Sequence, residues 1–175
     1  MSDSPENTPK SAAPAAEEKA APVIEAGPVC AALQAQGIAL TPVLSYACGV
    51  ETLATDPAQA LRVAEALKAQ GFDLLVSASG VDWKTHRDVV YHLYSLTSHQ
   101  FIALKIRAGE DDKVPSMMPV WPAADWHERE TYDLFGIHFE GHPRLERILM
   151  PVDWIGHPLR KDYVENDPRL VWNQR

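Results

Sequence analysis

Three strand-like segments between residues 72 and 108 constrain the fold of this chain most strongly. They read FDLLVSASGVDW, DVVYHLYSL and QFIALKIRA, and the third alternates apolar with charged residues as a half-buried strand does. The connections between them contain KTHR and TSH, which are short and polar and favour tight chain reversals. The sequence therefore predicts an antiparallel meander of three strands.

Two segments with helical spacing precede this meander. PVCAALQAQG begins with Pro28 and stops at Gly37, whereas DPAQALRVAEALKAQG has Asp56 as the N-cap, Pro57 in the first turn and Gly71 as the stop. Ala60, Val63, Ala64 and Leu67 form the predicted core face of the second helix. The stretch between the helices, IALTPVLSYACGVETLAT, contributes strand. The order predicts an α+β fold, with helices packed on one face of a largely antiparallel (mixed) sheet.

Composition divides the chain into three parts. Residues 1–26 are rich in alanine, proline and glutamate and lack aromatic residues, which predicts a disordered tail. Residues 27–138 form the α+β domain, and 175 residues with 46% hydrophobic composition suffice for one such core. Residues 139–175 have little periodicity and are interrupted by prolines. They are predicted to form an extended segment that lies over another surface, either that of their own domain or that of a partner.

Charge and cysteine usage exclude several classes of function. A net charge of −8, without a basic cluster along the sequence, argues against binding to nucleic acid or to anionic lipid. No apolar run approaches the ~20 residues of a spanning helix, so a membrane link is expected only through a partner. The start, MSDSPENTPK, has no hydrophobic core of a signal peptide, so we expect no export. Cys30 and Cys48 are isolated, which argues against cysteine-held iron–sulfur clusters and structural zinc.

The stretch WHERETYDLFG, residues 126–136, places five ionisable side chains among three aromatic ones. It belongs to a predicted helix that begins at Pro122 and ends before Gly136. At about 100° per residue, Glu128 and Glu130 point to different faces, whereas Arg129 and Asp133 share one. Apolar residues fall on two faces. The pattern fits a helix wedged between two surfaces, with charges that must find partners.

Two structural interpretations of this helix stay open. Its charges can be a solvated face with i, i+4 pairs, which contribute only about 0.3–0.5 kcal/mol each. Alternatively it forms a protein interface, since interfaces favour tryptophan, tyrosine and arginine and pair their buried charges. In the second case Arg129 is expected to hold a buried carboxylate.

Catalysis and cofactor binding are not predicted for this chain alone. The sequence has no nucleophile motif, although Glu130 and Asp133 are close enough on a helix to share a substrate. His138 and His142 have a spacing seen in zinc sites, and with His157 they leave a free-standing histidine-dependent metalloenzyme as a remote alternative. The two GHP triplets read more simply as turns, and neither HExxH nor a glycine-rich nucleotide motif occurs. We therefore expect no catalytic, metal or cofactor-binding residue.

Several linked motifs resemble the 30-kDa subunit of respiratory complex I, the NADH–quinone oxidoreductase. They are WPAADWHERETYDLFGIHFEGHP, RILMP, DWIGHPLRKDY and VVYHLYSL, and the resemblance covers roughly residues 28–165. The sequence departs from the family pattern at Glu146, Ile155 and Val164, where basic, acidic and proline residues are usual. The residues that the resemblance marks as signature or interface positions are Trp126, Glu128, Arg129, Glu130, Asp133, His142, Arg147, His157, Arg160 and Lys161.

The resemblance implies a cofactor-free subunit of the peripheral arm of a proton-pumping NADH:quinone oxidoreductase. Such a subunit packs against the quinone-site (49-kDa or D) subunit and other subunits of the arm, and supports assembly and electron transfer from NADH to quinone. FMN and the Fe-S clusters are then held by those partners, with the complex on the cytoplasmic side of the cell inner membrane. The alternative is the equivalent subunit of a related membrane-bound hydrogenase or ferredoxin-accepting complex.

Overall fold

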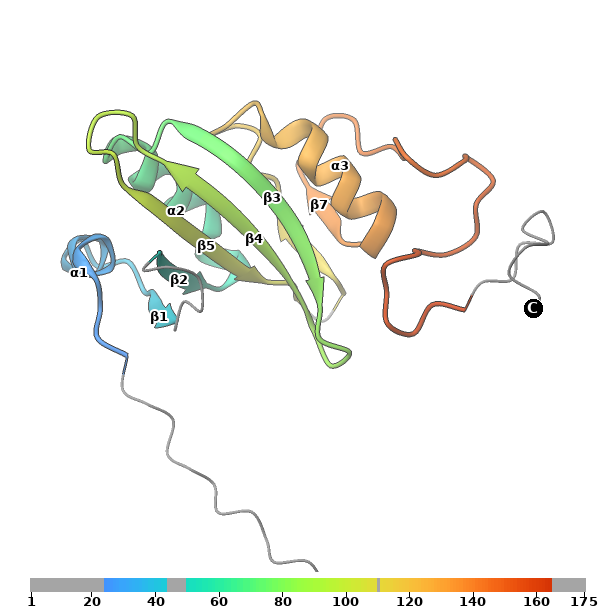
Figure 1. Cartoon of the computed structure of the whole chain (residues 1–175), viewed down its shortest axis with the longest axis horizontal. Coiled ribbons are helices and arrows are strands. Elements are labelled where there is room, and N and C mark those ends of the chain that lie inside the picture. Colours follow the sequence, from blue (N-terminus) through green and yellow to red (C-terminus); the bar gives the residue numbers. More distant parts are fainter. Residues whose placement is uncertain (1–23, 44–49, 110, 165–175) are drawn as a thin grey trace, which may run out of the picture.

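A five-stranded mixed sheet forms the centre of the molecule (Figure 1). The computed structural model describes residues 24–43, 50–109 and 111–164, so the predicted tail (1–26) lies almost wholly outside the described residues. The strand order is β1-β2-β5-β4-β3, and β3, β4 and β5 form the predicted antiparallel meander. β2 pairs parallel with β5, which makes the sheet mixed. The strands are β1 (Thr41–Val43), β2 (Glu51–Thr55), β3 (Leu74–Asp82), β4 (Arg87–Tyr94) and β5 (Phe101–Arg107).

Three helices pack on one face of this sheet, so the predicted fold class is confirmed. They are α1 (Pro28–Ala35), α2 (Pro57–Ala69) and α3 (Ala124–Phe135). α1 and α2 begin at the predicted prolines, but the Asp56 side chain makes no capping hydrogen bond. α3 begins at Ala124 instead of Pro122, because Pro122 lies in the turn that leads into the helix.

The core lies between this face of the sheet and the helices. Tyr91 of β4 stands opposite Leu104 of β5 in the ladder, and both side chains are buried. The predicted core face of α2 is the buried one. Every second residue of the central strands therefore points to the helices, and each helix buries one face against these residues. This follows from the two-residue repeat of a strand and the 3.6-residue repeat of a helix. The other residues of these two strands that belong to the core cluster are Val89, Leu93, Ile102 and Ile106.

A small second sheet joins the segment before α3 to the segment after it. β6 (Lys113–Pro115) pairs parallel with β7 (His138–Glu140). No strand was predicted from the sequence for EDDKVPSMMPV, the segment that contains β6. Three-residue strands are too short to show a period of two, and their pairing here depends on the chain reversal made by α3.

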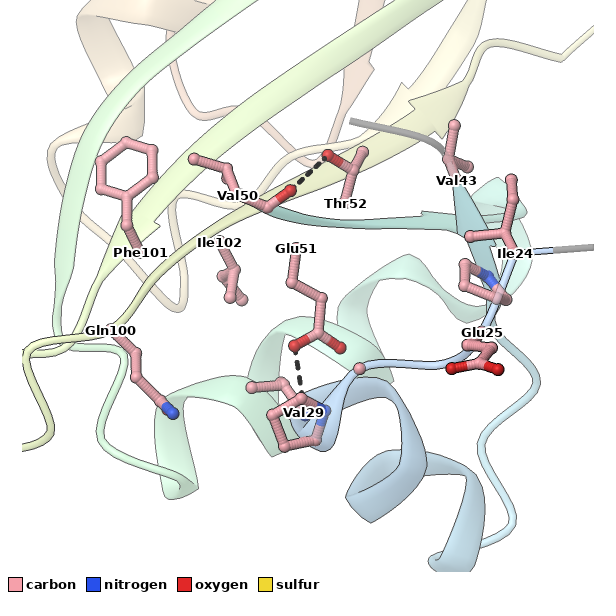
Figure 2. A pocket seen from close by; sticks show the side chains of 13 residues that line it. Ile24, Glu25, Val29, Val43, Val50, Glu51, Thr52, Gln100, Phe101 and Ile102 are labelled. Atoms are coloured by element: carbon pink, nitrogen blue, oxygen red, sulfur yellow. Dashed lines mark hydrogen bonds between the residues drawn. The ribbon is translucent and has the colours of Figure 1, made fainter. Parts of the chain in front are cut away.

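A carboxylate from β2 caps the N-terminus of α1. Glu51 Oε1 accepts a hydrogen bond from the backbone N–H of Cys30 at 2.7 Å, and Oε2 accepts one from Val29 at 3.3 Å. Figure 2 shows this carboxylate in a pocket of about 470 Å³ that Val43, Ile102 and other apolar residues line. A carboxylate near the first turn also complements the helix dipole. The Glu51 carboxylate therefore has a structural role at the start of α1.

Candidate interface site

α3 lies unusually close to the edge strand β3, and a glycine makes this approach possible. A Cβ atom at Gly80 would stand 2.7 Å from Phe135 Cδ2 and 2.9 Å from Thr131 Cγ2. Glycine within a strand is typical of a place where another element approaches the backbone closely. One face of α3 is thereby buried against the sheet, while Trp126 and Glu130 stay exposed on the other.

Glu128 is fully buried under α3 and is held by three donors from its own chain. Its carboxylate accepts hydrogen bonds from Ser116 Oγ at 2.6 Å, from the Met117 N–H at 2.7 Å and from Tyr91 Oη at 3.2 Å. Burial raises the pKa of Glu128 to about 7, although these three donors favour the ionised form. Glu128 thus joins α3 to β4 and to the segment after β6. Glu130 points to solvent, so the two glutamates face apart as predicted.

Asp133 is the second buried carboxylate of α3, and it anchors the segment of residues 144–164, named here the strap. Oδ2 accepts hydrogen bonds from the N–H groups of Ile148, Leu149 and Met150 at 2.8–3.0 Å. Oδ1 accepts one from Arg147 Nη1 at 2.9 Å. Burial opposes ionisation, but these amides and the guanidinium more than offset it and lower the pKa of Asp133.

The strap also supplies partners for the carbonyl groups at the end of α3. The last four carbonyls of a helix have no partner within it, and here each accepts a hydrogen bond from residue 136 or from the strap. His157 Nδ1 carries a proton, because the oxygen that it contacts can only accept. The four contacts are Gly136 N to Tyr132 O at 2.9 Å, His157 Nδ1 to Asp133 O at 3.0 Å, Leu159 N to Leu134 O at 3.0 Å and Arg160 Nε to Phe135 O at 2.6 Å.

Gly136 is required at this helix end for two reasons. Its φ is +73°, and a Cβ atom there would stand 2.5 Å from His157 Cδ2 and 2.7 Å from Arg160 Nη2. Gly136→Ala is expected to lower the free energy of unfolding by about 2–3 kcal/mol, since the left-handed conformation alone costs roughly 1–2 kcal/mol. Urea unfolding measures this loss. Gly141→Ala is the control, because Gly141 has φ +81° but open space around it. Equal losses would show that the contact with the strap contributes nothing.

The far end of the strap is fixed to the sheet. The Lys161 N–H donates to Asp82 Oδ2 at 2.8 Å, and the Lys84 N–H donates to Oδ1 at 2.7 Å. These two amides, that of Lys161 first, lower the pKa of the Asp82 carboxyl. The strap is therefore attached both to the end of α3 and to the end of β3. In Figure 1 it is the orange-to-red trace that follows β7 and runs past the end of α3.

Arg129 forms no ion pair with a carboxylate within the described part of the chain, so the buried carboxylate expected for it in an interface stays a prediction. Its side chain is 5% exposed, Nε donates to the Glu146 carbonyl at 3.3 Å, and the guanidinium lies 5.0 Å from the centre of the Trp126 ring. Asp133, which shares a face with Arg129, pairs with Arg147 instead. The partner of this carboxylate therefore comes from the strap and not from the helix itself.

His142 is structural in this arrangement. Its buried ring accepts a hydrogen bond at Nδ1 from the Arg144 N–H at 3.1 Å, and Nε2 lies 3.3 Å from Asp125 Oδ1. His138 is exposed, and His157 contacts α3. Within residues 24–43, 50–109 and 111–164, no three metal-ligating side chains gather in a way that could hold an ion.

The structure thus brings Asp133, Arg147, His157 and Arg160 together at the end of α3. It places Lys161 apart from them at β3, with Glu128 on the buried side of the helix. Sequence reasoning missed Tyr91, Ser116 and Asp82. Only their contacts in the folded chain identify them, because no local sequence pattern marks them. Together these contacts can hold the strap, a long irregular segment, in one position.

The described helices include none that is both long and apolar enough to cross a membrane. Residues 53–169 match the family described as "Respiratory-chain NADH dehydrogenase, 30 Kd subunit". The match covers more than half of the sequence, so the chain belongs to this family.

Curated relatives of the chain are named as C subunits of NADH-quinone oxidoreductase. The protein of Nocardioides sp. (strain ATCC BAA-499 / JS614) is 51% identical over 111 residues, which are 61% of this chain and 43% of that protein. That of Roseiflexus sp. (strain RS-1) is 54% identical over 52% of this chain and 55% of its own length. That of Xanthobacter autotrophicus (strain ATCC BAA-1158 / Py2) is 47% identical over 66% and 58%. The chain spans about half the length of these relatives.

Two solved structures share the fold. A trypsin-resistant fragment (1-134) of Nqo5 superposes with a TM-score of 0.57 at 29% identity, over 67% of this chain and 96% of the fragment. A chain of the membrane-bound sulfane sulfur reductase, an archaeal respiratory membrane complex, superposes with a TM-score of 0.59 over 75% of this chain and 81% of that chain. Its identity is 23%, so this second likeness concerns the fold alone.

Proposed function

We propose that the chain is a structural subunit of the peripheral arm of an NADH:quinone oxidoreductase. It docks on the quinone-site subunit and supports assembly on the cytoplasmic side of the inner membrane. FMN and the Fe-S clusters, and with them electron transfer and proton pumping, belong to the partner subunits. Membership of the 30-kDa subunit family and the names of the relatives support the assembly, and the strap supports the mode of docking.

The observation that carries this proposal is the exposed apolar surface of the strap. Its backbone is fixed by Asp133 and by the end of α3, yet its large apolar side chains face water. A monomeric protein rarely holds such side chains in solvent on an ordered segment, whereas a protein interface places them at its centre. The side chains are Leu149, Val152, Ile155, Leu159 and Val164, which are 52–96% exposed.

Val152→Asp is expected to weaken association with the quinone-site subunit at least ten-fold, because it places a charge in an apolar contact. Val152 is 96% exposed, so the free energy of unfolding should change by no more than about 0.5 kcal/mol. Co-purification of tagged chain with that subunit, with band intensities compared at matched expression, measures the effect.

Leu96→Asp is the matched control, since Leu96 is 61% exposed but lies in the turn between β4 and β5, away from the strap. Normal association of the Val152 variant, or an equal loss in the control, would contradict docking through the strap. A chain that purifies as a stable monomer without any respiratory subunit would contradict the proposed function itself.

The fold of the sulfane sulfur reductase chain favours one second candidate, a related membrane-bound complex with a different electron donor. The co-purifying subunits distinguish the two. A flavin-containing NADH-oxidising subunit in the purified assembly supports the first proposal, and a hydrogenase-like or ferredoxin-accepting module supports the second.

A further inference from the structure

We propose that a cationic surface around Trp83 binds an acidic, extended segment of a neighbouring subunit. This surface, named here the Trp83 surface, is separate from the apolar residues of the strap. The inference rests on the proposed function in one respect, namely that an assembly supplies the neighbour. The surface consists of Trp83, Lys84, Lys105, Arg107 and Lys161.

The indole ring is fixed by a buried carboxylate although half of the residue faces solvent. Trp83 is 50% exposed, and its Nε1–H donates to Asp88 Oδ2 at 2.7 Å. The side chain of Asp88 is fully buried, and the same oxygen lies 2.8 Å from Lys105 Nζ. Asp88 therefore sets the position of both an aromatic ring and an ammonium group at the surface.

A second buried carboxylate positions two further lysines. Asp82 accepts hydrogen bonds from the N–H groups of Lys84 and Lys161, which come from the turn after β3 and from the strap. Lys84 adopts a φ of +72°, a conformation that costs energy in a residue with a side chain and is held here by that contact. Lys161 Nζ lies 5.9 Å from the centre of the Trp83 ring, and Lys105 Nζ lies 5.3 Å from it.

The surface carries more positive than negative charge. Its four cations stand against the carboxylates of Asp82 and Asp88 and that of Asp56, which lines one pocket with Lys105 and Arg107. Arg107 is exposed and reaches Asp88 only at 3.8 Å. Within the described residues, neither Lys84 nor Lys161 forms an ion pair with a carboxylate. The chain as a whole has a net charge of −8, so this patch is opposite in sign to the protein around it. A surface of this charge is complementary to a carboxylate-rich partner.

Two features favour a peptide segment as the occupant. The half-exposed indole offers an apolar contact beside fixed cations, which suits a chain that alternates carboxylates with apolar groups. Lys161 belongs to the strap, so the Trp83 surface shares one segment with the proposed docking region.

Zero-length cross-linking tests the inference on the native assembly purified through a tag on this chain. A water-soluble carbodiimide joins a lysine amine to a carboxylate that contacts it, and mass spectrometry identifies the joined residues. Lys68 and Asp73 are the internal control, because both are exposed and Lys68 Nζ lies 3.4 Å from Asp73 Oδ1. We expect cross-links from Lys84 or Lys161 to an aspartate- or glutamate-rich stretch of another subunit.

Three results would overturn the inference. The first is a Lys68–Asp73 cross-link without any inter-subunit product at the Trp83 surface. The second is a set of cross-links from this surface only to Glu165 or Asp167 of the same chain. The third is binding of the intact chain to phosphatidylglycerol vesicles that depends on Lys84 and Lys161. Co-purification of the respiratory subunits in these cases would leave the proposed function standing. Purification of the chain without partners would overturn both.

A charge-neutralising pair of variants gives a second measurement. Lys84→Gln combined with Lys161→Gln is expected to weaken association with the assembly about ten-fold at physiological salt, whereas Lys68→Gln leaves it unchanged. Both changes keep a long polar side chain, and neither removes a backbone N–H that Asp82 binds. An equal effect of Lys68→Gln would mean that net charge alone matters and would overturn the inference.

Discussion

Asp133→Ala is expected to detach the strap from α3 and to lower the free energy of unfolding by about 3–5 kcal/mol. The substitution leaves three backbone N–H groups and the Arg147 guanidinium without the carboxylate that binds them. Buried donors that lose their acceptor, and a buried ion pair that loses one member, are among the most costly changes in a protein. Urea unfolding monitored by circular dichroism measures the loss.

Limited proteolysis separates local release from global unfolding in this variant. Trypsin is expected to cut within the strap, after Arg147 or Arg160, at least ten-fold faster than in the unaltered chain under conditions where the sheet stays folded. Glu130→Ala is the control, because Glu130 lies on the exposed face of the same helix. If the strap of the Asp133 variant resists trypsin like that of the control, the carboxylate is not its anchor.

The buried carboxyl of Glu128 is expected to make the protein less stable as the pH rises from 5 to 8. Its pKa is about 7 in the folded chain, against an ordinary value of 4.5. The folded state holds the proton more tightly, so the stabilisation is complete below pH 4.5 and is lost as the pH rises through 7. The difference in pKa corresponds to a loss on the order of 3 kcal/mol.

Glu128→Gln removes this titration and keeps the size of the side chain. The difference in unfolding free energy between the glutamine variant and the unaltered chain should therefore shift by about 2–3 kcal/mol in favour of the variant between pH 5 and pH 8. Urea unfolding at both pH values provides the comparison. Glu130→Gln, on the exposed face of the same helix, is the control for the substitution itself. Parallel pH profiles for the Glu128 variant and the unaltered chain would mean that this carboxyl does not titrate in the range.

The strands of the meander were predictable because each is long enough to show its period and is bounded by polar turns. The parallel pairing of β2 with β5 was not, since it joins segments that are about 50 residues apart and leaves no local signal. The strands β6 and β7 were missed for the same reason, combined with their length of three residues. Short periodic patterns thus identify elements, and tertiary contacts decide which of them pair.

The charges of α3 show the same limit. Their pattern left a solvated face and an interface with paired charges both open, and the partners of Glu128 and Asp133 in the structure lie elsewhere in the chain. Tyr91 is 37 positions from Glu128, and Met150 is 17 positions from Asp133. A window along the sequence likewise shows no basic cluster near Trp83, because its lysines and arginine come from three separate segments.

Because the strap provides the partners for three of the last carbonyls of α3, the helix cannot be completed by the residues that precede it. During synthesis the end of α3 leaves the ribosome before His157, Leu159 and Arg160 do, so its final turn stays open until about 25 further residues have followed. The contacts that complete the last turn of α3 therefore also fix the segment that carries the exposed apolar side chains.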